Sequence, residues 1–243
     1  MIIDPFDYAK RIGPMYGMQD FSIFLYALVR MHQPKLVFEL GSGSGTCALL
    51  CATAMKENGF GKFVSFDNGS QWESIREDKR ISYLGLEQVD TYSGFLQSLG
   101  AQSGLTAHLE FVDQTVPPFP EPSQPIDLLL ADYSSSQHDV SDLLKFFIPR
   151  MADSASIFID GASSSYRTFL FLEDTIAKLN RGKIPGFIAG EVDDQDLIGW
   201  IRLLHIRAFK LLHLTRPLPV QNSTAWIRVE PVDHFPYPPV TMR

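Results

Sequence analysis

The residues with the clearest chemical potential lie in the run FELGSGSGT, which spans positions 38–46. Three glycines follow the pattern G-x-G-x-G, and Glu39 stands two positions before the first of them. Glycines at a turn between a strand and a helix let the backbone bend tightly and approach a ligand closely. The dinucleotide fingerprint has a glycine at the sixth place, where this chain has Thr46. The run therefore predicts a ligand-binding turn that differs from the dinucleotide pattern.

Carboxylates recur where the predicted strands end. Glu39, Asp67, Asp113, Asp132 and Asp160 each stand on or beside the last residue of an apolar run. In an open parallel sheet these strand ends share one edge, and ligands bind there where the strand order reverses. An acidic rim suits a ligand that carries a sulfonium and an ammonium group, and it suits a pyrophosphate poorly. One opposite charge at ~4 Å contributes roughly 4 kcal/mol before desolvation, at an effective dielectric of ~20.

Other polar and aromatic side chains have competing interpretations. His138 follows Asp132 closely and could act as a general base, although a surface histidine at a helix start explains it as well. The serines at 134–136 could supply a nucleophile, but no G-x-S-x-G turn accompanies them. Cys47 and Cys51 are expected to pack in the interior. The aromatic candidates for a pocket wall, which core packing explains equally well, are Tyr16, Trp72, Tyr83 and Trp200.

These residues need a scaffold, and the hydrophobic pattern predicts alternating strands and helices. The predicted strands are 35–40, 62–67, 108–113, 127–132, 155–160, 209–215 and 224–230. The predicted helices are 19–31, 46–57, 71–87, 90–100, 138–148, 165–181 and 194–206. No helical pattern fits between the last two strands, so they are expected to pair antiparallel. The prediction is an α/β protein with a doubly wound, seven-stranded, mostly parallel sheet and a C-terminal antiparallel strand pair.

Composition sets the broad class. The chain has 243 residues, 45% hydrophobic residues and a formal net charge of −7, which fits a globular protein and disfavours nucleic acid as a partner. The sequence shows no signal-peptide pattern and no apolar run long enough to cross a membrane, and it has two cysteines. We therefore expect a cytoplasmic protein with no membrane partner. We expect one domain over 1–243, with an insertion at 69–90 and a proline-rich tail at 231–243.

Residues 36–45 match the first motif of the class I S-adenosylmethionine-dependent methyltransferases: an apolar strand, an acid, one residue and then G-x-G-x-G. The chain resembles this family over most of its length, and most closely the small-molecule, catechol-type O-methyltransferase branch. The resemblance implies a Rossmann-like fold with S-adenosylmethionine as the cofactor. It implies cofactor contacts from Glu39, Gly41, Ser42, Gly43, Gly45, Asp67, Asn68, Asp113, Gln114 and Asp132.

The family also implies a role for individual acids. Glu39 would lie near the methionine end of the cofactor, and Asp67 would accept hydrogen bonds from both ribose hydroxyls. Asp113 would accept from the adenine amine, with Asn68 and Gln114 flanking the base. The alternative for each acid is that it merely solvates a strand end.

A metal is a further implication of the resemblance. In metal-dependent catechol-type enzymes, acids after the fourth and fifth strands hold Mg²⁺ together with an Asn that follows the second acid. Asp132 and Asp160 would be the acids here, but Gly161 stands in place of the Asn, so one ligand is missing. The alternative is that Asp132 shapes the pocket and Asp160 caps the next helix. Without a metal, Asp132 or His138 would be the proton acceptor.

The implied reaction is transfer of a methyl group to a small-molecule acceptor. Methyltransferases that act on nucleic-acid amines often carry Asp/Asn-Pro-Pro-Tyr after the fourth strand, where residues 131–134 read ADYS. This difference favours an oxygen nucleophile. The stretches 69–90 and 183–200 are expected to close over the pocket, and a homodimer is one expected assembly. Two alternatives remain: a non-catalytic S-adenosylmethionine-binding protein, and a nicotinamide-dependent dehydrogenase, which Thr46 disfavours.

Overall fold

A computed structural model describes residues 2–15, 17–78, 81, 89–190, 194–215 and 223–232. Its strands form one sheet with the order β3-β2-β1-β4-β5-β7-β6. The strands are β1 (Leu36–Leu40), β2 (Lys62–Asp67), β3 (Leu109–Asp113), β4 (Ile126–Ala131), β5 (Met151–Asp160), β6 (Arg207–Thr215) and β7 (Ser223–Pro231). Strands β1 to β5 are parallel, whereas β7 pairs antiparallel with both β5 and β6. The predicted fold class and the terminal antiparallel pair are confirmed.

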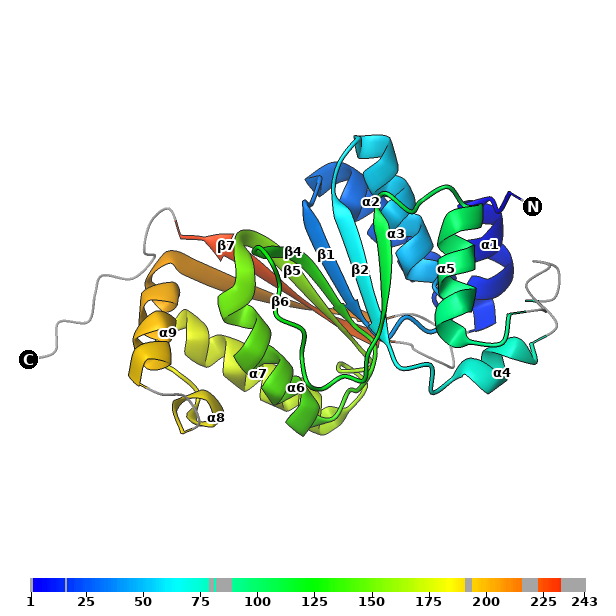
Figure 1. Ribbon diagram of the computed structural model, residues 1–243. Coiled ribbons are helices and arrows are strands. Elements are labelled where there is room, and N and C mark those ends of the chain that lie inside the picture. Colours follow the sequence, from blue (N-terminus) through cyan, green and yellow to red (C-terminus); the bar gives the residue numbers. More distant parts are fainter. Residues whose placement is uncertain are drawn as a thin grey trace, which may run out of the picture.

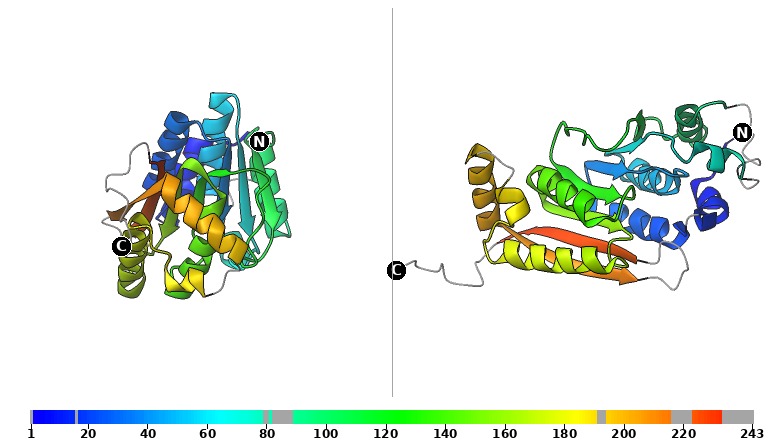
Figure 2. Two further views of the ribbon diagram at one scale, coloured as in Figure 1. Left: turned by 90° about the vertical axis from the view of Figure 1, so that its left-hand side faces the viewer. Right: turned by 90° about the horizontal axis from the view of Figure 1, so that it is seen from below.

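Helices cover both faces of the sheet (Figures 1 and 2). One face is covered by α1 (Pro5–Ile12), α2 (Gln19–His32), α3 (Thr46–Asn58), α4 (Trp72–Arg76) and α5 (Tyr92–Gln102). The other face is covered by α6 (Gln137–Phe147), α7 (Tyr166–Asn180), α8 (Gly186–Ala189) and α9 (Asp194–Ile206). The 3₁₀ turns η1 (Gly13–Met15) and η3 (Ile148–Arg150) complete the described elements. None of the helices in the described part of the chain is long and apolar enough to cross a bilayer.

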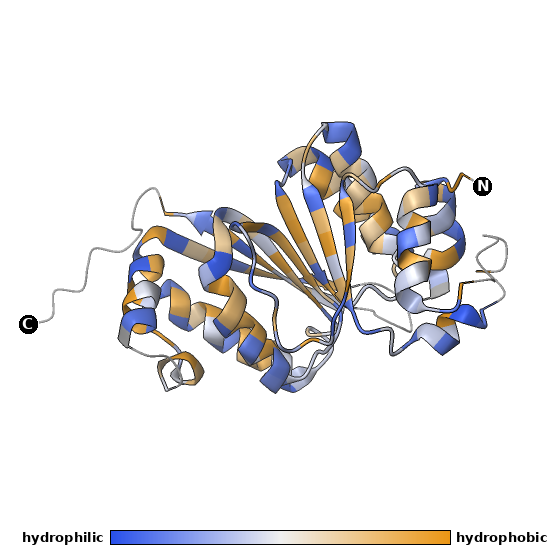
Figure 3. Cartoon of the chain, viewed as in Figure 1, coloured by the Kyte–Doolittle hydropathy of each residue, from blue (hydrophilic) through white to orange (hydrophobic). Residues whose placement is uncertain are grey.

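The central strands are largely hydrophobic, as Figure 3 shows. All five residues of β1 are buried, which is typical of a parallel strand between two helical layers. Phe38 and Leu40 pack into the cluster under α6 and α7, whereas Val37 packs into the cluster under α2 and α3. Because successive side chains alternate between faces, Glu39 lies on the same face as Val37. A carboxylate is therefore held in the interior next to the glycine loop.

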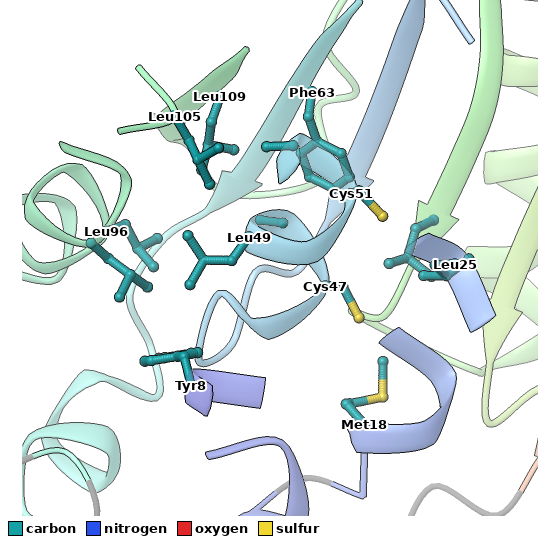
Figure 4. Close-up of a cluster of buried hydrophobic side chains, with 14 of the residues drawn as sticks. Tyr8, Met18, Leu25, Cys47, Leu49, Cys51, Phe63, Leu96, Leu105 and Leu109 are labelled. Atoms are coloured by element: carbon teal, nitrogen blue, oxygen red, sulfur yellow. The ribbon is translucent and has the colours of Figure 1, made fainter. Parts of the chain in front are cut away.

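Helix α3 lies in the interior and carries both cysteines. The thiols of Cys47 and Cys51 are free, and burial raises the pKa of each well above its ordinary value. In Figure 4 they lie among apolar side chains, including Met18 and Leu25. The expectation that both cysteines are buried in the interior is confirmed.

Helix α1 is absent from the prediction, although its signals are present in the sequence. Asp4 caps it by accepting from the amides of Phe6 at 2.9 Å and Asp7 at 2.8 Å, and Pro5 opens the first turn. Asp7 and Arg11 then form an ion pair of 2.8 Å one turn apart. The helix has only eight residues, so its apolar pattern extends over little more than two turns.

The insertion after β2 differs from its prediction. In place of one helix over 71–87 the structure has α4 (Trp72–Arg76), and residues 79–80 and 82–88 lie outside the described part of the chain. Trp72 does not line the cavity described below: its ring packs at 5.3 Å from that of Phe95 in the hydrophobic core. Its indole N–H donates to the carbonyl of Asp90 at 3.3 Å.

Candidate functional site

A cavity of about 300 Å³ opens at the carboxyl ends of β1, β2 and β4. It lies where the strand order reverses between β1 and β4, the position at which open α/β sheets bind their ligands. The residues that line it are Met18, Glu39, Gly41, Ser42, Gly43, Ser44, Thr46, Cys47, Phe66, Asp67, Asn68, Ser70, Gln71, Gln114, Val116, Asp132 and Tyr133.

Glycine stands at three positions of the loop after β1 for different physical reasons. Gly41 has a φ of +94°, and a Cβ there would lie 2.4 Å from the carbonyl oxygen of Asp132. Only glycine therefore lets the β1 and β4 backbones pass each other. Gly43 has a φ of +50° and no neighbouring atom within 4 Å, so its position faces open space. Gly45 is absent from the lining, because it begins α3 against Leu96 and Leu99.

Asp67 holds this loop in place. Its Oδ2 accepts from the amides of Ser42 at 2.8 Å and Gly43 at 3.2 Å, and its Oδ1 accepts from the amide of Gly69 at 2.7 Å. A carboxylate offers about four lone-pair positions, so roughly one remains for a ligand hydroxyl. Asp67 therefore combines a structural task with a place in the cavity lining.

Two tyrosines hold the same loop by its carbonyl groups. The Tyr8 hydroxyl of α1 donates to the Ser44 carbonyl at 2.5 Å, and the Tyr92 hydroxyl of α5 donates to the Gly43 carbonyl at 2.6 Å. Burial raises the pKa of Tyr92, so it remains a hydrogen-bond donor. Sequence reasoning missed both residues, because they are 36 and 49 positions away from the carbonyls that they contact.

Glu39 is the most deeply buried acid of the site, with 2% of its surface exposed. Burial raises the pKa of its carboxyl well above the ordinary value, and the charges of Asp132 and Asp67 add to that effect. A hydrogen bond from the Ser65 hydroxyl works in the opposite direction. A cationic ligand in the cavity would favour the ionised form, so Glu39 is placed to respond to positive charge.

Most of the predicted cofactor residues come together in this cavity, but not all of them. Glu39, Gly41, Ser42, Gly43, Asp67, Asn68, Gln114 and Asp132 line it. Asp113 does not: it is exposed beside Asp67 on the edge strand β3. His138 also lies outside, with 83% of its side chain exposed and its Nε2 3.9 Å from an Asp142 oxygen. An exposed imidazole outside the cavity matches the surface interpretation of His138.

The predicted metal pair does not form a metal site. Asp160 is buried, accepts from the Thr224 hydroxyl at 2.7 Å and is absent from the cavity lining that includes Asp132. In the described ranges, no group of three or more His, Cys, Asp or Glu side chains is placed to hold an ion. These donors do not fit Mg²⁺, which needs a near-octahedral set of oxygen ligands. Asp160 is also not a helix cap, since Ser165 begins α7.

The serines after β4 have a structural role. The hydroxyls of Ser134 and Ser136 donate to one oxygen of Asp139 at 2.5 and 2.7 Å. These two bonds lower the pKa of Asp139. Ser136 in turn accepts from the Asp139 amide at 3.1 Å and caps α6. The spacing S-x-x-D before an apolar run is the local signal that indicates this cap.

Several lining residues were missed, and several predicted ones lie elsewhere. Tyr133 lines the cavity directly after Asp132, and its pKa is raised, chiefly by burial. Trp200 belongs to α9 and packs into the hydrophobic core, and no described residue of 183–200 lines the cavity. Tyr16 and Tyr83 lie outside the described residues. Ser70 and Gln71, from the stretch 69–90 that was expected to close over the pocket, do line the cavity. The lining residues without a sequence signal are Met18, Phe66 and Val116.

Residues 38–162 match the family model described as a methyltransferase domain. This match covers more than half of the 243 residues. The chain belongs to this methyltransferase family. No curated protein matches it. The prediction of a methyltransferase is confirmed, and family membership argues against the dehydrogenase alternative.

Solved structures share the fold of this methyltransferase. The O-methyltransferase TomG from Streptomyces achromogenes has a TM-score of 0.54 at 12% identity, covering 95% of this chain and 91% of that chain. A putative O-methyltransferase from Klebsiella pneumoniae has a TM-score of 0.54 at 11% identity, covering 94% and 90%. The O-methyltransferase from Bacillus cereus has a TM-score of 0.51 at 12% identity, covering 95% and 93%. The likeness confirms the Rossmann-like methyltransferase fold.

Proposed function

We propose that this methyltransferase binds S-adenosylmethionine in the cavity beyond β1 and transfers the methyl group to an oxygen of a small-molecule acceptor. The observation that carries the proposal is the charge of the lining. Glu39, Asp67 and Asp132 face one cavity that has no Lys, Arg or His among its described lining residues. Such a lining favours a ligand with a sulfonium and an ammonium group. TomG and the Bacillus cereus enzyme were crystallised with this cofactor or its demethylated product, which supports the proposal.

The lining residues divide among the parts of the cofactor. Glu39 receives the cationic methionine end, because ionisation of its buried carboxyl is favoured by a positive charge. Asp67 uses its remaining acceptor position for a ribose hydroxyl. Asn68 and Gln114 flank the adenine, supported by their place in the lining near Asp67. No contact is assigned to the exposed Asp113.

The chemistry then requires an acceptor oxygen held in line with the methyl group and the sulfur. S-adenosylmethionine supplies an electrophilic methyl group when bound. Asp132 is the candidate that takes the acceptor's hydroxyl proton, since it lines the cavity and its amide donates to the Leu40 carbonyl at 2.8 Å. That backbone bond fixes Asp132 beside the glycine loop. His138 is assigned no part, and no step is assigned to a metal.

Calorimetry and a turnover assay test this proposal. S-adenosylmethionine and its demethylated product should bind in the micromolar range or tighter, whereas NAD should not bind. A panel of phenols, catechols and hydroxylated small molecules should yield at least one methylated product. Asp132→Asn should lose turnover while cofactor affinity falls less than in Asp67→Ala, and His138→Ala serves as the matched control that retains turnover. Wild-type turnover that is unchanged by a chelator would keep the metal out of the mechanism.

Each contrary outcome has a distinct meaning. Cofactor binding without turnover on any acceptor would favour the non-catalytic alternative, and preferential NAD binding would contradict the cofactor assignment. Full activity of Asp132→Asn would remove that residue from the mechanism.

The proposal also includes the location of the protein, the class of its acceptor and its assembly. A cytoplasmic location is supported by the two free cysteines. An acceptor other than nucleic acid is supported by the net charge of −7. We also propose that the chain is one domain and assembles as a homodimer, for which light scattering is the direct measurement.

A further inference from the structure

Outside the cavity, three side chains from separate elements form a hydrogen-bonded chain. Ser163 lies in the loop between β5 and α7, His213 lies on β6, and Glu173 lies on α7. The Ser163 hydroxyl is 2.7 Å from Nδ1 of His213, and Nε2 of the same ring is 2.9 Å from Oε1 of Glu173. None of the three lines the cavity of the proposed methyl transfer.

The chemistry of the groups fixes the direction of these bonds. An ionised carboxylate only accepts, so the bond to Glu173 requires a hydrogen on Nε2 of His213. In the neutral ring Nδ1 then carries a lone pair, and Ser163 must donate to it. A hydroxyl that donates to an imidazole, which a carboxylate orients in turn, is the arrangement that activates a serine nucleophile.

Neighbouring side chains hold the His213 imidazole in place and leave Ser163 partly exposed. The ring of Phe169 stacks beside that of His213, with centroids 4.3 Å apart and planes 35° apart. The His213 side chain is 20% exposed and that of Glu173 is 53% exposed, while Ser163 is half-buried. The imidazole is therefore held in place, and the serine beside it is partly exposed.

Donors for a developing negative charge lie two residues farther along the chain. Ser165 is the N-cap residue of α7, and its hydroxyl accepts from none of the amides of the first turn. Such amides, together with the helix dipole, favour an oxyanion. Tyr166 and Leu170 stand exposed on the first turns of the same helix. Their apolar surface fits an apolar group on the substrate.

We propose that Ser163 is a nucleophile for acyl transfer from esters with an apolar acyl group, activated by His213 and oriented by Glu173. The Ser163 oxygen forms a bond to the acyl carbon while its proton moves to Nδ1 of His213. The ester C–O bond breaks, and the departing alkoxide takes that proton. Water then attacks the acyl-serine with the same base, which releases the carboxylic acid and restores the serine. This activity is independent of methyl transfer.

A fluorophosphonate probe tests the proposal directly, because its phosphorus forms a bond to an activated serine oxygen and fluoride leaves. The whole protein should be labelled at one serine, which peptide mass spectrometry should place at Ser163. Ser163→Ala should abolish labelling, and His213→Gln should slow it by about 100-fold, the scale of general-base catalysis. Glu173→Gln should slow it by a smaller factor. Hydrolysis of p-nitrophenyl butyrate should follow the same order.

Ser164→Ala is the matched control. Ser164 is the next residue, and its hydroxyl donates to the Gly161 carbonyl at 2.9 Å instead of contacting a histidine. This variant should be labelled at the wild-type rate. Thermal melts of all variants show whether each is folded, and labelling is measured without S-adenosylmethionine, so failure of the methyltransferase assay leaves the result unaffected. Label on another serine, no label on the wild-type protein, or equal rates in folded wild-type and His213→Gln proteins would overturn the proposal.

Discussion

The loop after β1 and the loops after β4 and β5 lie at the same edge of the sheet, but they are held in different ways. Residues 41–45 are held through their backbone: one Asp67 oxygen accepts two of their amides, and Tyr8 and Tyr92 donate to two of their carbonyls. Residues 132–136 and 161–165 also have backbone bonds, from the amides of Asp132 and Gly161, but side chains of their own add to these. The side chains are those of Ser134, Ser136 and Ser163.

The two kinds of loop are suited to different tasks. A loop held by its backbone can present glycines and carbonyl groups to a ligand at close range without using side chains of its own. A loop held by side chains places hydroxyls and carboxylates at defined positions, where they can exchange protons. The first arrangement suits the binding of a cofactor, and the second suits proton transfer. The following variants test this contrast, from the largest expected effect to the smallest.

Gly41→Ala should be the most damaging change in the backbone-held loop. The new Cβ would stand 2.4 Å from the Asp132 carbonyl oxygen at a φ of +94°. Strain and overpacking together should lower the free energy of unfolding by about 3–5 kcal/mol in urea denaturation. Gly43→Ala is the control, because no atom lies within 4 Å of its Cβ position. It should lose only about 1–2 kcal/mol of stability while weakening cofactor binding, since the methyl enters the cavity. Equal destabilisation by the two changes would contradict this account of the loop.

Asp67→Ala should act next most strongly, and on binding. The change removes the acceptor of the Ser42, Gly43 and Gly69 amides together with a ribose contact. Calorimetry should show S-adenosylmethionine affinity reduced by about 1.5–3 kcal/mol, the scale of hydrogen bonds to a charged group. Asp113→Ala should leave affinity unchanged, because the exposed Asp113 lies outside the cavity. A comparable loss in both variants would restore Asp113 to the site.

Glu39→Gln should change how stability depends on pH. Burial raises the pKa of Glu39 in the folded protein above its unfolded value, so the folded state retains a proton that the unfolded state releases. Stability of the cofactor-free protein should therefore fall as pH rises above the ordinary glutamate range, with a slope of up to about 1.4 kcal/mol per pH unit from this group. Glu39→Gln should remove that part of the slope. Denaturation curves of the two proteins from pH 4 to 8 would test this, and parallel slopes would contradict it.

Ser136→Ala should have the smallest effect, confined to the side-chain-held loop. Loss of the cap on α6 should lower the free energy of unfolding by about 1 kcal/mol. The Ser134 and Ser136 hydroxyls hold the pKa of Asp139 low, so their contribution is present above the ordinary aspartate range and is lost as pH falls through the folded value. The variant should therefore differ from wild type less in acid than at neutral pH. Ser141→Ala, in the same helix, should be neutral, and an equal loss in both would show that the cap is not the cause.

Local sequence patterns were enough to predict much of the scaffold and half of the site. Strand and helix periodicity depends on neighbouring residues, so the seven strands and their terminal antiparallel pair were predictable. The glycine loop was predictable for the same reason, because backbone with a positive φ favours glycine. The carboxyl ends of parallel strands share one edge of the sheet. The common location of Glu39, Asp67 and Asp132 at one cavity was therefore predictable as well.

Local reasoning failed where the outcome depends on what packs nearby. Asp113 ends a strand as Asp67 does, but its strand is at the sheet edge, outside the cavity. His138 follows Asp132 closely in the sequence, yet its side chain at the start of α6 is exposed to solvent. Asp160 resembles a metal ligand in sequence, but β7 places Thr224 against its carboxylate.

The sequence by itself determined the α/β scaffold, the glycine loop and the acidic strand ends, because each follows from rules that act within a few residues. Only the tertiary structure decided which side chains meet. Tyr8 reaches the Ser44 carbonyl across 36 residues, and Ser163 meets His213 across 50. Such contacts depend on strand register and on how helices pack against the sheet. A single residue of register shift would turn His213 to the other face of β6, so no local pattern can encode its contact with Ser163.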